Sequence, residues 1–133
     1  AAPPAAVVEG RALIIDDVPD IADSCAWLLD GLVRHVQVAY SGAQGIEMAR
    51  QQPPDLVLCD LGMPGMDGHE TCRQLRRLPG LAHTLIAAVS GYGGGESLRA
   101  SQAAGFDRHL VKPVGLAALE DLVRSVALRS APA

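Results

Sequence analysis

Short runs of consecutive apolar residues alternate along this chain with amphipathic stretches of helical length. The clearest run, residues 56–60, reads LVLCD and follows a pair of prolines. Shorter or less regular segments of the same kind occupy residues 13–15, 36–40, 85–90 and 109–111. Strands that are apolar throughout, rather than at every second position, indicate a sheet covered on both faces, and strands that alternate with helices indicate parallel βαβ units. The sequence therefore predicts an α/β fold, with an open five-stranded parallel sheet flanked by five helices.

The stretches between these runs have the spacing of helices. The first begins near Pro19, ends near Gly31 and is expected to bury Ile21, Cys25, Leu28 and Leu32 on one face. Others are expected from about residue 41 to 51, near 69–75, and after the glycine run at 93–95. The last helix is expected to bury five apolar side chains: Leu116, Leu119, Leu122, Val123 and Val126.

The chain has 133 residues, which suits one domain with its own core. We expect residues 10–129 to form it, with an Ala/Pro-rich tether at 1–9 and a tail at 130–133. The cysteines Cys25, Cys59 and Cys72 form no CxxC pair and are expected to be small buried hydrophobes in a reducing compartment.

Charge and hydropathy exclude several classes of protein. The net charge is −4, with both signs scattered, so the basic surface needed for direct nucleic-acid binding is missing. No apolar run approaches the roughly 18 residues of a membrane span, and the N-terminus does not resemble a signal peptide. A cytoplasmic protein is expected.

Polar residues follow the predicted strands where each one ends. The first strand leads into Asp16-Asp17, the third ends in Asp60, the fourth in Ser90, and the fifth is followed by Lys112. The ligand crevice of an open α/β sheet lies at this edge. Taken singly, the aspartate pair could be a helix cap, the serine a turn residue and the lysine a surface charge.

Together, these residues predict a cation site. Three carboxylates in one small volume repel one another unless they share a cation, and oxygen ligands suit Mg2+. With the repulsion offset, a carboxylate such as Asp60 could act as a nucleophile toward a phosphoryl group. Lys112 and Ser90 could then bind the new phosphoryl oxygens, the first by charge and the second by a hydrogen bond.

Four segments resemble the receiver domains of two-component response regulators, in that family's order and spacing: IIDDVPD, LVLCDLGMPGMDG, AAVSGYG and AGFDRHLVKPV. The resemblance covers about residues 11–128. It implies a flavodoxin-like, doubly wound sheet of strand order 2-1-3-4-5. It also implies a cis bond between Lys112 and Pro113.

The resemblance implies a role for each matching residue. Asp60 would be phosphorylated, Asp17 and Asp60 would bind Mg2+ directly, Asp16 would act through water, and the carbonyl of Gly62 would complete the protein ligands. Ser90 would be the switch hydroxyl and Lys112 the cation beside the phosphoryl group. The donor would be a histidine kinase or a histidine phosphotransfer protein, and the domain would be a phosphoryl acceptor rather than an enzyme with metabolic turnover.

One position departs from the commonest family pattern. The switch residue of the fifth strand is usually Tyr or Phe, and here it is His109. Either this titratable ring alters the usual aromatic movement, or it simply lies on the surface where partners dock. Gly62 and Tyr92 occupy positions that influence dephosphorylation in the family; the glycine leaves space for water, and the tyrosine could cover the pocket.

Several readings of the whole protein stay open. The Ala/Pro-rich tether and the segments SGYG and HLVKPV resemble receivers of bacterial hybrid histidine kinases. This resemblance favours such a receiver module over a stand-alone regulator. Weak homodimerisation through the fourth helix, fifth strand and fifth helix is a further option. A Mg2+-dependent aspartyl phosphatase would carry a DxD motif and a cap segment, whereas Asp16 and Asp17 are adjacent here. An interaction module that is never phosphorylated would not need the acidic residues that are intact here. A nucleotide-binding domain would carry a GxGxxG motif, which this sequence lacks.

Overall fold

The computed structural model describes residues 7–91 and 98–130. Within these ranges the elements are β1 (Val8–Ile15), α1 (Pro19–Asp30), β2 (Val33–Ala39), α2 (Gly42–Gln51), β3 (Leu56–Asp60), α3 (Gly68–Arg76), β4 (Leu85–Ser90), α4 (Leu98–Ala104), β5 (Arg108–Val111) and α5 (Leu116–Ser130). Tyr92, the glycine run at 93–95, most of the predicted tether and the end of the tail lie outside the described residues.

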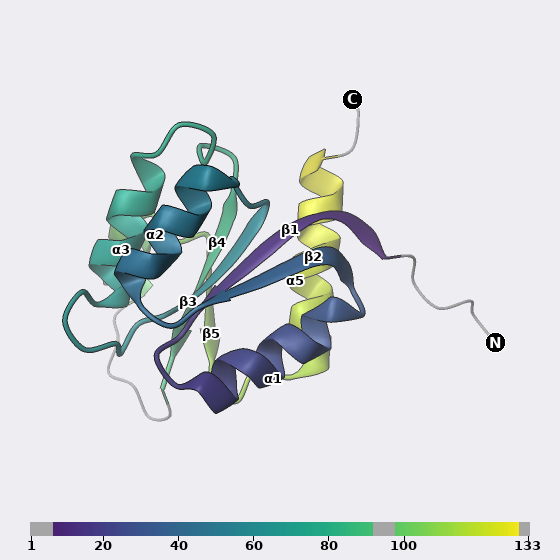
Figure 1. The fold of residues 1–133 in the computed structure, drawn as a ribbon, viewed down its shortest axis with the longest axis horizontal. Helices are drawn as coiled ribbons and strands as arrows, with labels where there is room; N and C mark the ends of the chain where they lie inside the picture. The colour runs from purple at the N-terminus through teal and green to yellow at the C-terminus, as the bar shows by residue number, and fades with distance from the viewer. Residues whose placement is uncertain (1–6, 92–97, 131–133) are drawn as a thin grey trace.

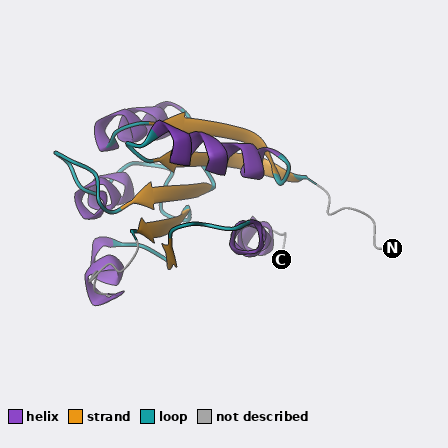
Figure 2. Ribbon diagram, turned by 90° about the horizontal axis from the view of Figure 1, so that it is seen from below, coloured by secondary structure: helices purple, strands orange, loops and turns teal. Residues whose placement is uncertain are grey.

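The strands form one parallel sheet in the order β2-β1-β3-β4-β5 (Figure 1). This order confirms the predicted doubly wound topology. Viewed from below, the strands follow one another in a twisted stack with helices on both sides (Figure 2). None of the helices in the described ranges is long and apolar enough to span a bilayer.

Successive residues of the central strands pack alternately into two separate hydrophobic cores, one on each face of the sheet. Leu13, Val57 and Ile86 pack under α2, α3 and α4 on one face of the sheet. Their neighbours Ile14 and Leu58 pack on the other face, under α1 and α5. Because alternate side chains of a strand point to opposite faces, a strand between two helical layers must be apolar throughout. The continuous apolar runs of the sequence have this structural cause.

The prediction for the buried face of helix α1 holds in part. Its fully buried residues are Ala22 and Leu29, whereas Ile21 is 41% exposed and Cys25 and Leu28 are half-buried. Cys25, Leu28 and Leu32 nevertheless pack against the core, so the prediction fails only for Ile21, and the larger side chains border a cavity of about 560 Å3 beside Val114. In α5 the prediction holds for the residues from Leu119 to Val126, but Leu116 is exposed.

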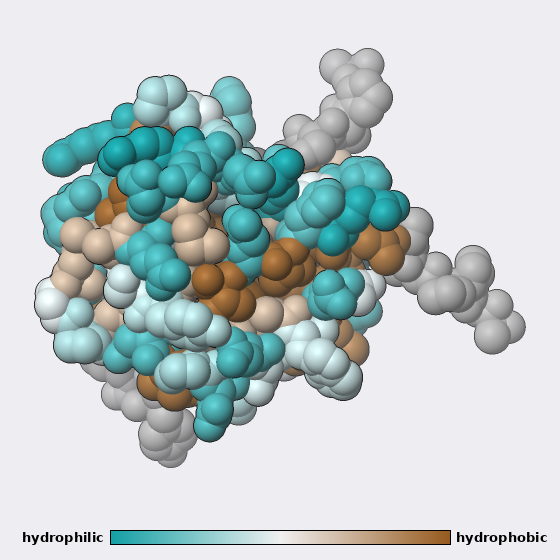
Figure 3. All heavy atoms as spheres, in the orientation of Figure 1, coloured by the Kyte–Doolittle hydropathy of each residue, from teal (hydrophilic) through white to brown (hydrophobic). Residues whose placement is uncertain are grey.

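The first two strands begin earlier than predicted. Strand β1 starts at Val8, which pairs with Val33, so residues 8 and 9 of the expected tether belong to the sheet. Strand β2 lies at the sheet edge and has only half-buried valines in its centre, Val36 and Val38. A band of hydrophobic side chains accordingly crosses the visible face of the molecule where this edge lies (Figure 3). Cys59 and Cys72 are buried as expected.

Candidate functional site

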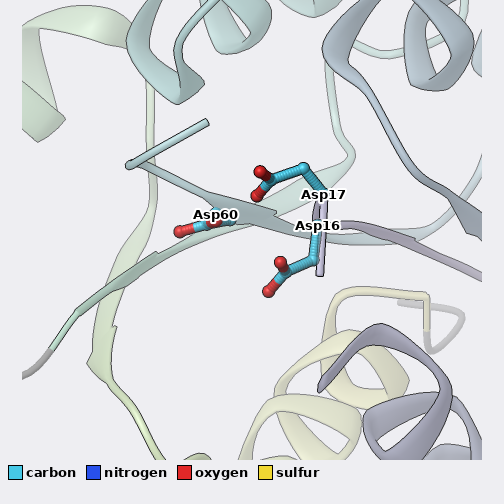
Figure 4. A group of neighbouring side chains, drawn as sticks. All are labelled: Asp16, Asp17 and Asp60. Carbon is cyan, nitrogen blue, oxygen red and sulfur yellow. The ribbon is translucent and has the colours of Figure 1, made fainter. Parts of the chain in front are cut away.

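Three carboxylates meet at the carboxyl end of the sheet. Strands β1 and β3 pair in register up to Ile15 and Cys59, so the next residues of the two strands, Asp16 and Asp60, emerge side by side. Asp16, Asp17 and Asp60 each offer a carboxylate oxygen, and these oxygens lie within 4.8 Å of one another. The carboxylate groups point to the same side (Figure 4). The predicted acidic cluster is therefore present as a single group.

Lys112, which directly follows the edge strand β5, completes this group. Its Nζ lies 3.1 Å from Asp16 Oδ2 and 3.3 Å from Asp60 Oδ1. The backbone N–H of Lys112 donates to the carbonyl of Ser90, which holds the residue after β5 against β4. The bond between Lys112 and Pro113 is cis, as the family resemblance implied. One ammonium thus faces two nearly buried carboxylates.

Burial and charge shift two ionisation equilibria in the cluster. The pKa of Asp16 is raised, first because burial disfavours its charged form and further because the Asp60 carboxylate repels it. Burial alone would lower the pKa of Lys112, but the hydrogen bond and charge of Asp16, together with those of Asp60, raise it overall. Excess negative charge in a partly desolvated site is the condition in which a cation binds.

Backbone N–H groups hold the carboxylates in position. Val18 N donates to Asp16 Oδ1 at 3.0 Å, and Gly62 N donates to Asp60 Oδ1 at 3.1 Å. The loop after β3 returns so close to the end of that strand that a Cβ on Gly68 would lie 2.4 Å from the Asp60 carbonyl oxygen. Only glycine permits this approach. The start of α3 thereby buttresses the strand end that carries Asp60.

Ser90 and His109 form a second group beside the acidic cluster. The Ser90 hydroxyl lies 3.0 Å from His109 Nε2 and 3.4 Å from the Leu110 carbonyl oxygen. The other ring nitrogen, Nδ1, lies 3.1 Å from the hydroxyl of Ser101 on α4. His109 is half-buried, and both of its ring nitrogens lie within hydrogen-bonding distance of serine hydroxyl groups.

Sequence reasoning missed Ser101. The residue is 2% exposed, as buried as Ala104, which lies at 3%. Residues three apart lie on the same face of a helix, so the Ser-x-x-Ala spacing was the available signal that Ser101 faces inward. Tyr92, predicted to influence the site, lies outside the described residues.

The residues of the acidic cluster fit Mg2+. The donors that the structure brings together are the carboxylate oxygens of Asp16, Asp17 and Asp60, and no sulfur or imidazole belongs to this group among the described residues. Hard oxygen donors with room for water are the ligand set that Mg2+ prefers over zinc or copper. Asp16, Asp17 and Asp60 would hold the ion.

The fold and this arrangement of side chains define a class of signalling protein. The family model of the response regulator receiver domain matches residues 12–124. The chain therefore belongs to the response regulator receiver family, the phosphoryl-accepting domains of two-component systems.

Two relatives illustrate how such domains occur. The signal transduction histidine-protein kinase BarA of Escherichia coli K12 is 33% identical over 111 residues, covering 84% of this chain but only 12% of BarA. An uncharacterised 14.6 kDa protein of Leptolyngbya boryana is 33% identical over 121 residues, covering 90% of this chain and 92% of that protein. The match thus spans a small part of one relative and nearly all of the other.

A solved structure supports the same assignment. The CheY-like response regulator receiver domain of Methanospirillum hungatei superposes with a TM-score of 0.82 at 27% identity, covering 92% of this chain and 97% of that one. The shared architecture therefore covers most of both chains.

Proposed function

We propose that this domain accepts a phosphoryl group on Asp60 from a phosphohistidine, with Mg2+ held by Asp16, Asp17 and Asp60. The observation that carries the proposal is the position of Asp60, which is 5% exposed and lies within hydrogen-bonding reach of Lys112. A nearly buried carboxylate beside two others is unfavourable for structure alone, so a functional requirement explains it.

The two oxygens of Asp60 have different surroundings. Oδ1 accepts from Gly62 N and faces Lys112 Nζ. Oδ2 has no hydrogen-bonding partner among the described residues, so it is the oxygen available for attack. In the transfer, the bond from Oδ2 to phosphorus forms as the bond from phosphorus to the histidine nitrogen of the donor breaks, and the imidazole leaves. A bound Mg2+ would supply positive charge to the transferring oxygens.

Lys112 and Ser90 act on the product. The ammonium of Lys112 already lies at the acidic cluster and would pair with the phosphoryl oxygens of the acyl phosphate. Ser90 ends the neighbouring strand β4, and its hydroxyl would turn to donate to the phosphoryl group. That rearrangement would shift the population of conformations at the α4-β5-α5 face. Water would later hydrolyse the acyl phosphate, with Gly62 leaving space for its approach.

The wider setting is proposed from the relatives. We favour the receiver module of a hybrid histidine kinase, because BarA is a histidine kinase whose matching region is 12% of its length. A stand-alone regulator is the alternative, since the Leptolyngbya boryana protein is matched over 92% of its length. In either setting the donor would be a histidine kinase or phosphotransfer protein in the cytoplasm. A weak homodimer through the α4-β5-α5 face belongs to the same proposal.

Intact-mass spectrometry after incubation with acetyl phosphate tests the proposal. The protein should gain one phosphoryl group with Mg2+ present and none with EDTA, and Asp60→Asn should gain none. Asp121→Asn is the matched control, because its carboxylate is 68% exposed on α5, and it should be modified like the wild type. Turnover of a generic phosphate ester without an adduct would favour the aspartyl phosphatase instead, and an adduct on Asp60→Asn would contradict the proposal.

A further inference from the structure

The imidazole of His109 lies between two buried hydroxyl groups. Nε2 is 3.0 Å from Ser90 Oγ, and Nδ1 is 3.1 Å from Ser101 Oγ. The two serines are 3% and 2% exposed, and they belong to different elements, β4 and α4. His109 itself lies on β5, where it pairs with Ala88 of β4. The ring therefore joins the strand end beside Asp60 to helix α4.

The available donors and acceptors determine the direction of the hydrogen bonds that link Ser90, His109 and Ser101. Ser90 Oγ lies 3.4 Å from the Leu110 carbonyl oxygen, which can only accept, so Ser90 gives its proton there. Ser90 Oγ then accepts the Nε2–H of His109. A neutral ring that donates from Nε2 must accept at Nδ1, so the Ser101 hydroxyl donates to it. This arrangement satisfies all three groups, with the ring in its Nε2–H tautomer.

We propose that Ser101 is a positioning residue that acts through His109 on the Ser90 hydroxyl, so that a hydrogen-bonded Ser90–His109–Ser101 relay couples the state of Asp60 to α4. The inference rests on the proposed phosphorylation of Asp60 and names the residues that transmit it. A phenyl or phenol ring at position 109 could fill the same space, but it could not bond both hydroxyl groups. The relay is therefore a property of histidine in this place together with serine at position 101.

The relay holds Ser90 in the resting arrangement. Its hydroxyl donates to the sheet and accepts from His109, so it must give up at least the first of these bonds to donate to a phosphoryl group on Asp60. When Ser90 turns, the Nε2–H of His109 loses its acceptor unless the ring follows. Any movement of the ring disturbs the bond to Ser101. Conversely, removal of the Ser101 hydroxyl loosens the ring and makes the turn of Ser90 easier.

Nitrogen-15 NMR of the His109 ring tests the hydrogen bonds themselves. The wild type should show the Nε2–H tautomer, and Ser101→Ala should shift the Nδ1 resonance and mix the tautomers. Ser125→Ala is a matched control, since the hydroxyl of this serine donates to the carbonyl of Asp121 in its own helix α5, and it should leave the ring unchanged. An Nδ1–H tautomer in the wild type, or a ring unaffected by Ser101→Ala, would overturn the relay.

A double-mutant cycle tests the coupling, with beryllofluoride and Mg2+ as the phosphoryl mimic and fluorine NMR as the readout. Ser101→Ala should lower the beryllofluoride midpoint by roughly three- to tenfold, the equivalent of one hydrogen bond. In the His109→Phe background, which keeps a ring but no nitrogens, Ser101→Ala should have no further effect. Equal effects in both backgrounds would show that the serine acts by packing, and the proposal would fail.

The two proposals fail in different ways. If the wild type bound no beryllofluoride, the phosphorylation of Asp60 and its coupling would both be wrong. If the wild type bound it and Ser101→Ala left the midpoint unchanged, the coupling alone would be wrong. A shifted midpoint that depends on His109 supports both.

Discussion

Replacing Asp60 by asparagine should stabilise the domain in the absence of divalent cations. The substitution keeps the shape of the side chain and removes one of three negative charges at the end of the sheet. It also removes the partner of Lys112 at 3.3 Å. The sign of the net effect depends on which of these interactions is larger.

The distances give the magnitude. At an effective dielectric constant of about 20, two like charges at the 4.8 Å limit of the group repel by about 3.5 kcal/mol, and the pair at 3.3 Å attracts by about 5 kcal/mol. Asp60 faces two carboxylates, one of them the half-exposed Asp17, whose share is reduced by solvent. The repulsions together exceed the attraction, so Asp60→Asn should raise the free energy of unfolding by about 1–2 kcal/mol.

Urea unfolding in EDTA and in excess Mg2+ measures this directly. In EDTA the midpoint should rise for Asp60→Asn and change little for Asp121→Asn, whose exposed ion pair with Arg124 contributes roughly 0.5 kcal/mol or less. Mg2+ at about a hundred times its dissociation constant should add about 2.7 kcal/mol to the wild type and less to Asp60→Asn. A destabilised Asp60→Asn in EDTA, with no response of the wild type to Mg2+, would refute the electrostatic reasoning.

Three further outcomes are expected. Gly68→Ala should destabilise the fold by about 1–3 kcal/mol in urea unfolding and slow acetyl phosphate labelling, because its methyl group would collide with the backbone of Asp60; an unchanged midpoint would contradict the contact. Arg76→Ala should lower the free energy of unfolding by about 2–3 kcal/mol, because the guanidinium donates to three backbone carbonyl groups. Arg77 is exposed, so Arg77→Ala should lower it by less than about 0.5 kcal/mol, and equal losses would refute the argument. Burial raises the pKa of Cys25 from 9.0 to about 11, so alkylation at pH 8 should be roughly a hundredfold slower in the folded protein than in urea; equal rates would show an exposed thiolate.

The sequence predicted the sheet and most of the site for one physical reason. Apolar runs between two helical layers must be continuous, and the polar residues that follow them fall at one edge of a parallel sheet. Asp16, Asp60 and Lys112 could be placed together on this ground, and their contacts confirm it. The cis bond before Pro113 was implied by the family resemblance rather than by spacing.

The missed features depend on how elements pack. Periodicity selected the larger residues of α1, including Ile21, but the helix approaches the sheet through Ala22. The start of β1 at Val8 was missed because its first four residues alternate between half-buried and exposed and so do not form a continuous apolar run. The contact of Ser101 with His109 depends on which face of the seven-residue helix α4 turns inward, and the Ser-x-x-Ala spacing was the one weak signal for this orientation.

The identity of the phosphorylated residue is the decisive measurement. After incubation with acetyl phosphate and Mg2+, borohydride reduction would convert an aspartyl phosphate to homoserine, and peptide mass spectrometry would locate it. The arrangement of Asp16, Asp17 and Lys112 around one carboxylate predicts homoserine at position 60 and nowhere else. Homoserine at another aspartate, or none under conditions that label a known receiver domain, would contradict the proposed function.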